Sequence, residues 1–172
     1  MNIFETDRLN IRNLRESDSD GYFDMMGNVN VMSLVPRKVM SREESDQHLQ
    51  KLLDHYQKQS DTKVWAIETK NEQAFIGLGG FLKNSGGDHE IGYRLREQFW
   101  RNGFGTEFTK GLISFGFEEL KFEKIIADVA VTNLNSVKIL EKFMSVEKEF
   151  FNVSDNCVDR RYFVLRTDWI EG

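Results

Sequence analysis

One short loop carries the clearest chemical signal in the chain. It lies between a predicted strand and a predicted helix and reads Arg101-Asn102-Gly103-Phe104-Gly105-Thr106. Glycines let the backbone pass close to a bulky anion, and a helix N-terminus offers unpaired N–H groups together with about half a positive charge. The loop therefore predicts either a cradle for a pyrophosphate group or a plain strand-to-helix turn that uses glycine for its dihedral angles.

The two common nucleotide-binding loops can be tested against the sequence. A Walker loop needs the triplet Gly-Lys-Ser/Thr, which does not occur in the chain. A dinucleotide-binding turn needs Gly-x-Gly-x-x-Gly, and both candidate turns fail at the last position, where Phe108 and Leu82 stand. What remains is a coenzyme that has a pyrophosphate group but uses neither loop.

A carboxylate on the preceding strand is the first candidate for acid–base chemistry. The strand is predicted over Glu90–Leu95, and alternation puts Glu90 and Gly92 on one face and Ile91 and Tyr93 on the other. A partly buried glutamate has a raised pKa, which suits a general base that works near neutral pH. The competing interpretation is an exposed edge residue with no role.

The histidines give no indication of a metal site. His48 and His55 lie two turns apart on one predicted helix, so we expect a solvated face there rather than metal ligands. His89 adjoins Glu90, where it either relays a proton or has no role. We therefore expect no metal.

The composition restricts the class of protein. The 172 residues have a formal net charge of −5 and contain one cysteine, Cys157. One cysteine excludes an intramolecular disulfide and a cysteine-based zinc site, and the lack of a basic cluster argues against nucleic acid as a partner. No stretch approaches the ~18 apolar residues of a membrane span, and the N-terminus lacks the apolar run of a signal peptide. We expect a cytoplasmic protein with no membrane partner.

Periodicity and capping predict the elements that hold these residues. Ser41 and Glu44 form a capping box that opens a helix expected to end near Gln59, and Ser17 or Asp18 is the expected N-cap of an earlier helix. Helices are predicted over 17–28, 41–59, 105–119 and 133–143, and strands over 9–12, 64–69, 74–82, 90–95, 125–131 and 161–166.

The order of these elements predicts a mixed α/β fold, with a mostly antiparallel twisted sheet and helices on both faces. Gly77, Gly79 and Gly80 interrupt one strand, which predicts a bulge or a close backbone approach. No internal repeat or linker is found, so we expect one domain over residues 1–172.

The residues around the loop resemble those of a known family. Ile91–Leu95 followed by Phe99–Glu107 is similar to the coenzyme A loop of the GNAT acetyltransferases. Trp100 fits the RimJ/RimL-like branch of ribosomal-protein N-terminal acetyltransferases. That branch usually has glycine where this chain has Arg101, which makes the loop less flexible here without removing its N–H donors.

Three further segments extend the resemblance over nearly the whole chain. Glu5–Leu9 with Arg12 resembles the opening of the branch, Asn133–Lys142 resembles its late helix, and the ending is similar at Tyr162, Asp168 and Trp169. The chain departs from the pattern after the late helix, where Lys-Leu-Gly-Phe is replaced by Lys142-Phe143-Met144-Ser145. Glycine usually takes a left-handed position there, so we expect Met144 to reshape the turn.

The resemblance implies the GNAT acyl-CoA N-acyltransferase fold and an N-acetyltransferase that moves an acetyl group from acetyl-CoA directly to a primary amine. It implies that the pyrophosphate sits on the backbone of Arg101–Thr106, and that the pantetheine arm lies between the strands near Tyr93–Leu95 and Ile126–Val131. Besides the loop, the implied coenzyme-binding residues are Tyr93, Arg94, Leu95, Asn133, Asn135 and Ser136.

The resemblance also implies roles in catalysis. Glu90 matches the general base, while the tyrosine that many members use as general acid is replaced by Leu140. Ser136, one turn earlier, is the hydroxyl that remains near the expected thiolate, where it either donates a hydrogen bond or packs at the helix start. A backbone N–H near Leu95 would stabilise the oxyanion, which contributes roughly 3–4 kcal/mol when preorganised.

The acceptor is left open among a protein N-terminus, a polyamine and a small amine. Its specificity is expected from Gly27–Glu44 and from the loop after Phe151, and the acidic balance favours a cationic acceptor. Relatives commonly form homodimers, which the sequence neither requires nor excludes. The alternative function is a non-catalytic acyl-CoA-binding or regulatory module of the same fold, which the missing tyrosine keeps open.

Overall fold

A single mixed sheet organises the part of the chain that the computed structural model describes, residues 1–34, 37–56, 62–84 and 86–169. Its strand order is β1-β2-β3-β4-β5-β6-β8-β7. The strands are β1 (Asn2–Glu5), β2 (Leu9–Arg12), β3 (Lys63–Thr69), β4 (Phe75–Lys83), β5 (His89–Leu95), β6 (Lys124–Ala130), β7 (Ser145–Asn152) and β8 (Cys157–Leu165). The helices are α1 (Ser19–Met26), α2 (Val29–Met32), α3 (Arg42–His55), α4 (Phe104–Glu118) and α5 (Leu134–Leu140).

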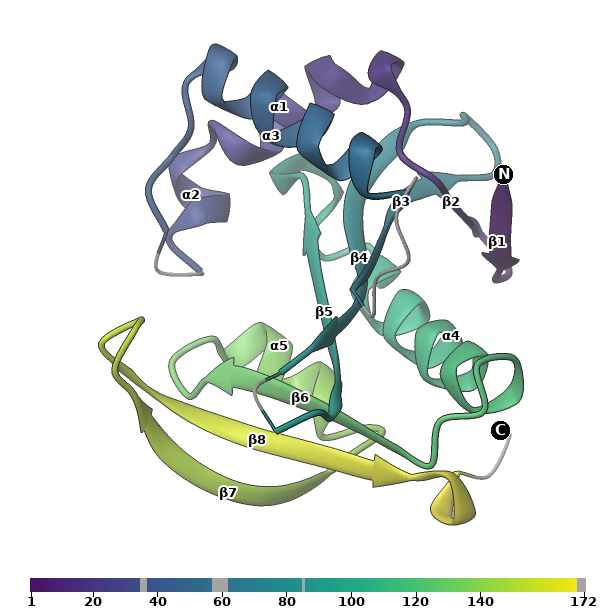
Figure 1. The fold of residues 1–172 in the computed structure, drawn as a ribbon, viewed down its shortest axis with the longest axis vertical. Helices are drawn as coiled ribbons and strands as arrows, with labels where there is room; N and C mark the ends of the chain where they lie inside the picture. Colours follow the sequence, from purple (N-terminus) through teal and green to yellow (C-terminus); the bar gives the residue numbers. More distant parts are fainter. Residues whose placement is uncertain (35–36, 57–61, 85, 170–172) are drawn as a thin grey trace.

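The helices cover the two faces of the sheet (Figure 1). Helices α1–α3 lie over one face of the first half of the sheet, where Tyr22, Met25 and Ala66 are fully buried between them. Helices α4 and α5 pack on the other face, where the core includes Phe108 and Tyr162. The predicted fold, a mostly antiparallel sheet with helices on both faces, is confirmed.

The junction of β5 and β6 divides the sheet. Among the described strands, β5 and β6 pair in parallel while the other pairs are antiparallel. A parallel pair needs a crossover connection, and α4 lies in it. The two strands pair only at His89 with Ile125 and at Glu90 with Ile126. Beyond Glu90 the strands separate, so the edge of β5 that faces β6 has no partner strand (Figure 1).

The glycines of β4 confirm the predicted bulge and close approach. The register of β3 and β4 shifts by one residue between Ile67 and Glu68. A Cβ at Gly77 would lie 2.2 Å from the Arg94 carbonyl oxygen, and one at Gly80 would lie 1.8 Å from that of Lys63. No side chain fits at either position, so glycine is required where β4 runs between β3 and β5.

The helix predictions are confirmed with two corrections. Ser41 and Glu44 form the predicted capping box of α3, but α3 ends at His55 rather than near Gln59, which lies outside the described residues. Asp18 precedes α1, yet its carboxylate does not cap the helix. It binds Arg12 instead, six positions earlier, a contact that no capping pattern predicts.

Three elements were not predicted: β1, α2 and β7. Each is short or mostly exposed, so its apolar periodicity is weak. β7 forms the sheet edge beside β8 and follows the turn at Met144. Met144 is buried and does not adopt a positive φ, so the expected reshaping of this turn is confirmed.

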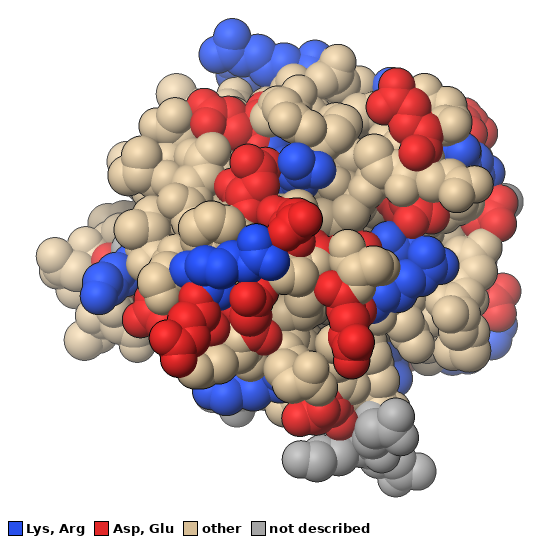
Figure 2. Space-filling view, turned by 90° about the horizontal axis from the view of Figure 1, so that it is seen from above, with Lys and Arg blue, Asp and Glu red and all other residues tan. Residues whose placement is uncertain are grey.

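Opposite charges alternate over the face seen from above in Figure 2. Lys and Arg side chains are interspersed there with Asp and Glu, so this face carries no continuous basic patch. No helix in the described ranges is long and apolar enough to cross a membrane.

A buried ion-pair cluster ties β2 to β3 and to the turn before α1. Arg12 donates to both Asp18 oxygens at 2.9 and 2.8 Å and to Glu68 at 2.6 Å. All three side chains are less than a tenth exposed. These carboxylates are tolerated inside the protein because one guanidinium binds both of them.

We predict that Arg12→Met destabilises the protein by about 3–5 kcal/mol, because it leaves two buried carboxylates without a cation. Urea unfolding followed by circular dichroism measures the change. Arg42→Met is the matched control, since Arg42 also binds two carboxylates, Asp20 and Asp46, but is 48% exposed. We expect the control to cost less than about 1 kcal/mol, and equal costs for the two variants would contradict the prediction.

Candidate active site

The predicted loop is a set of unpaired N–H groups at a helix N-terminus. Gly103 adopts a left-handed φ of 80° and precedes the first residue of α4, Phe104. The first bond of the helix runs from the Glu107 N–H to the Gly103 oxygen. In the described structure the N–H groups of residues 101–106 donate to no protein acceptor, so they are available to an anion.

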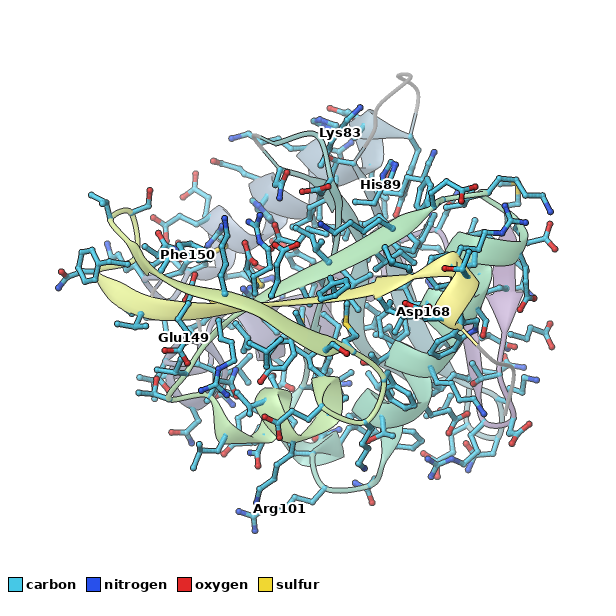
Figure 3. The ribbon with its side chains drawn as sticks, turned by 90° about the horizontal axis from the view of Figure 1, so that it is seen from below. Lys83, His89, Arg101, Glu149, Phe150 and Asp168 are labelled. Atoms are coloured by element: carbon cyan, nitrogen blue, oxygen red, sulfur yellow. The ribbon has the colours of Figure 1, made fainter. Side chains whose placement is uncertain are left out.

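Arg101 takes the place where the resembling branch has glycine, and it is strained. Its φ is 61°, in the left-handed region that a side chain makes unfavourable. Its side chain projects outward from the molecule (Figure 3). The backbone shape of the loop is therefore kept although the glycine is lost.

Two contacts that the sequence did not reveal hold this loop. Arg8 donates to Glu107 at 2.6 Å and to the Asn102 carbonyl at 3.0 Å, and its guanidinium lies 4.6 Å from the centre of the Phe104 ring. Arg8 and Glu107 are 99 positions apart, so no local pattern could pair them. They account physically for the arginine in the N-terminal segment that resembles the branch.

Trp100 fixes the other end of the loop. Its indole Nε1 donates to the Leu95 carbonyl at 3.0 Å. The short turn between them, Glu97–Phe99, is folded back against the end of β5. Trp100 therefore connects the end of β5 to the start of the loop, which places the loop at the far end of the unpaired edge of β5, five residues beyond Glu90.

The residues predicted to line the coenzyme lie on both faces of β5. Tyr93 and Leu95 face α4 and α5, whereas the Arg94 side chain lies on the other face, with Nη1 3.0 Å from the Met26 sulfur. Burial raises the pKa of Tyr93, and the neighbouring Ser136 side chain opposes part of this rise. An added Cβ at Gly105 would lie 2.8 Å from the Tyr93 hydroxyl, so these three residues meet.

Helix α5 carries the remaining predicted residues. The Asn133 side chain accepts from the Ser136 N–H at 3.3 Å and so caps the start of α5. Asn135 is exposed and Leu140 is buried. The Tyr93–Ser136 contact was not predicted, because it joins a strand to a helix far along the chain.

Glu90 lies at the vertex where β5 and β6 separate, on the face opposite α4 and α5. No described residue forms a hydrogen bond or an ion pair with its carboxylate. Burial raises the pKa of Glu90 to about 7, and the negative charge of Asp128 adds to the rise. The expectation of a partly buried glutamate with a raised pKa is confirmed, while its role as a base stays a prediction.

The charges around Glu90 come from β6 and β8. Arg161 binds Asp128 through two contacts of 2.7 Å, and Asp159 is buried. The guanidinium of Arg161 lies 5.5 Å from the centre of the Phe150 ring. Figure 3 shows Phe150 and Glu149 on opposite sides of β7, with Phe150 toward Lys83.

The histidines lie away from the loop. His48 is half-buried rather than on a solvated face, because its Nδ1 lies 2.6 Å from the Tyr22 hydroxyl, so that expectation was wrong for His48. His55 is exposed, and the His89 ring stacks on Phe122 with centroids 3.5 Å apart. Within the described ranges no group of His, Cys, Asp and Glu could hold a metal ion.

Comparisons with known proteins add to this geometry. A family model described as an acetyltransferase (GNAT) domain matches residues 8–143. YoaA of Bacillus subtilis, named an uncharacterized N-acetyltransferase, is 33% identical over 150 residues, which cover 86% of this chain and 84% of YoaA.

Two solved structures show the same fold. Spermidine N-acetyltransferase from Vibrio cholerae, in complex with CoA and spermine, has a TM-score of 0.78 and 20% identity over 93% of this chain and 96% of that one. RimL, a ribosomal L7/L12 alpha-N-protein acetyltransferase in complex with coenzyme A, has a TM-score of 0.77 and 20% identity over 96% and 98%. At such identity the likeness concerns the fold alone.

We predict that Glu90→Gln stabilises the protein above pH 7. The folded state binds the Glu90 proton up to about pH 7, whereas an unfolded glutamate releases it near 4.5, so the wild type loses stability as pH rises between these values. At pH 8 we expect the free energy of unfolding to rise by about 1–2 kcal/mol, less than the full pKa shift implies because water reaches part of the carboxyl. The gain disappears below pH 4.

Thermal unfolding of both proteins from pH 4 to pH 8 measures this difference. Glu147→Gln is the contrasting control, because Lys124 lowers the pKa of Glu147, so its replacement is expected to destabilise, again only above pH 4. A Glu90→Gln gain that is the same at every pH would show that burial of the carboxylate is not its cause.

Proposed function

The chain belongs to the GNAT acetyltransferase family, and on this premise we propose that it moves an acetyl group from acetyl-CoA directly onto a primary amine. One observation supports this proposal most: the unpaired N–H groups of residues 101–106 follow the end of β5 whose edge has no partner strand. An anion-binding helix N-terminus next to an open strand edge suits a long molecule with a pyrophosphate at one position and amide groups at another.

The residues present fit acetyl-CoA. The N–H groups of Arg101–Thr106 would hold its pyrophosphate, and the unpaired edge of β5 at Ile91–Leu95 would bind the amides of the pantetheine arm. Acetyl-CoA supplies an activated thioester. Asn133 and Asn135 at the start of α5 stay predicted contacts of the same arm.

Glu90 is the proposed general base. The acceptor amine must lose a proton before it attacks, and a carboxylate with a pKa of about 7 is poised to take that proton at neutral pH. Glu90 lies where the open edge of β5 begins, and no described residue forms a hydrogen bond or an ion pair with its carboxylate. It would act directly or through one water molecule.

The oxyanion and the leaving thiolate need donors. A backbone N–H on the open stretch of β5 would stabilise the oxyanion, which contributes roughly 3–4 kcal/mol when preorganised. Ser136 is the proposed donor to the thiolate, and its side chain lies beside Tyr93 of β5. Leu140, at the position of the usual tyrosine, is buried and has no proton to give.

The acceptor stays within the class of primary amines: a protein N-terminus, a polyamine or a small amine. Proteins of this fold include the spermidine and ribosomal-protein acetyltransferases named above, which supports such a class without choosing a member. We also propose that the chain belongs to the RimJ/RimL-like branch, that the protein is cytoplasmic and that it forms a homodimer. A non-catalytic module is disfavoured, because it would have no use for an unpaired carboxylate with a pKa of about 7.

We predict that acetyl-CoA and CoA stabilise the protein while NAD does not. At about 100 times the dissociation constant a ligand contributes roughly 2.7 kcal/mol, which raises the melting temperature of a domain this size by roughly 5–10 °C. Gly103→Ala should weaken this shift, since a Cβ there strains a φ of 80° and lies 3.3 Å from the Arg8 guanidinium.

Gly87→Ala is the matched control, because Gly87 has the same φ of 80° in a loop outside the proposed site. Both variants carry similar strain, but only Gly103→Ala should lose coenzyme affinity. Equal loss in both, or no shift of the wild type with acetyl-CoA, would make the loop an ordinary turn.

We predict that kcat/KM for an accepted amine rises about tenfold per pH unit up to about pH 7. Glu90→Gln should lower it by about 10²–10⁴ and abolish this ionisation. Asp128→Asn should shift the ionisation to lower pH, because the Asp128 charge helps to raise the pKa of Glu90. Steady-state rates from pH 5 to 9 test both, and an unchanged profile in Glu90→Gln would assign the base elsewhere.

A further inference from the structure

Strand β5 carries one acidic and one basic side chain, Glu90 and Arg94, on the same face, with open space between them. Glu90, Gly92 and Arg94 alternate onto the face away from α4 and α5. A Cβ built at Gly92 would meet no atom within 4 Å. The α carbons of Glu90 and Arg94 are about 13 Å apart at about 3.3 Å per residue, a distance that a small molecule could span.

Arg94 is a mostly buried cation without a counter-ion. Its Nη1 lies 3.0 Å from the Met26 sulfur, which is a weak acceptor. Across the described ranges no carboxylate forms an ion pair with Arg94. Burial lowers the pKa of Arg94, and the charge of Arg37, which has the same sign, lowers it further.

The groups that face Arg94 from the neighbouring helices supply no negative charge. Tyr22 of α1 is a neutral phenol whose pKa burial raises further. Its hydroxyl lies 2.6 Å from Nδ1 of His48 on α3, and burial with the charges of Arg37 and Arg94 lowers the pKa of His48. This end of the β5 face is therefore positive and otherwise neutral.

The other end of the same face is negative. Glu90 has Asp128 and Asp159 for neighbours, and both add to its tendency to keep a proton. Arg161, the cation that opposes this tendency, is already bound by Asp128 at 2.7 Å. An amine is attracted to this end and an anion to the end at Arg94.

An isolated buried charge is costly, and where it lies at a binding site a ligand can supply the missing partner. The planar fork of arginine matches carboxylates and phosphates through two parallel hydrogen bonds. We propose that the acceptor is a primary amine that also carries an oxyanion, such as the carboxylate of an amino acid, with the amine over Gly92 beside Glu90 and the oxyanion on Arg94. This inference rests on the proposed acetyl transfer and names the acceptor class for it.

The proposal separates two kinds of acceptor that the family relationship leaves open. A polyamine would bring a second cation toward Arg94 and Arg37, where like charges repel. The cationic acceptor that the net charge favours is thus expected only at the Glu90 end. Arg37 lies within Gly27–Glu44, the segment predicted from the sequence to set specificity.

The test uses pairs of amines that differ by one carboxylate: lysine with cadaverine, ornithine with putrescine, and phenylalanine with phenethylamine. We expect kcat/KM of the wild type to favour the amino acid of a pair by at least about tenfold. Arg94→Met should lower kcat/KM for the amino acid at least about tenfold more than kcat/KM for its partner amine. Replacing an unpaired buried cation should also leave the melting temperature equal or higher.

Arg166→Met is the control, because it removes the same charge from a partly exposed ion pair with Glu123 at the end of β8. It should leave the preference unchanged. A wild type that prefers the diamines, or an Arg94→Met variant that loses both members of a pair equally, would overturn the proposal. A lower melting temperature with general loss of activity would make Arg94 a structural residue.

The acetyl-CoA thermal shift, measured on every variant, separates this proposal from the one on which it rests. If the wild type binds acetyl-CoA but shows no preference that depends on Arg94, the acceptor class alone is wrong. If it binds no acetyl-CoA, the proposed function itself fails. If it turns over no pair, N-acetyl-lysine and N-acetylcadaverine are titrated onto its CoA complex, and the absence of an Arg94-dependent difference counts against the oxyanion.

Discussion

The separation of β5 and β6 after two residue pairs is the constraint on which the rest of the structure depends. Two parallel strands that diverge leave backbone groups without partners, and such groups must be covered or used. Helices α4 and α5 pack on one face of the opening, and α1–α3 cover the first half of the sheet on the other (Figure 1). Each proposed role follows from this opening: the loop lies beside it, Glu90 stands at its vertex, and Ser136 borders it from α5.

Three charged residues show how burial serves different ends in one molecule. Arg12 is matched by two carboxylates and holds the sheet to the turn before α1. Glu90 and Arg94 are partly or mostly buried without a matching charge, on one face of β5. A fully matched cluster stabilises the fold, whereas an unmatched group weakens it unless a ligand completes it. The contrast separates the structural charges from those available for chemistry.

The sequence predicted what depends on local pattern. The capping box at Ser41, the interrupted strand at Gly77–Gly80 and the helix behind Gly103 were all found as expected. Side-chain contacts outside the capping and periodicity patterns escaped prediction: Asp18 binds Arg12 instead of capping α1, and Arg8 meets Glu107 across most of the chain. The edge strand β7 was missed because its exposed residues carry no apolar alternation. A raised pKa for Glu90 could be expected from burial, but the part played by Asp128 needed the pairing of β5 with β6.

The link between Arg8 and the loop has a consequence for the order in which the protein folds. Arg8 and Glu107 are 99 positions apart, and the pairing of β1 with β2 and of β2 with β3 must form around them. Contacts with such long sequence separation pay a large loop-closure cost and tend to slow folding. During synthesis the first strands must therefore wait until α4 has emerged before the loop acquires its support. In a nascent chain that ends before α4, Arg8 has not yet met Glu107. The proposed coenzyme loop is therefore one of the last parts of the molecule to reach its folded structure.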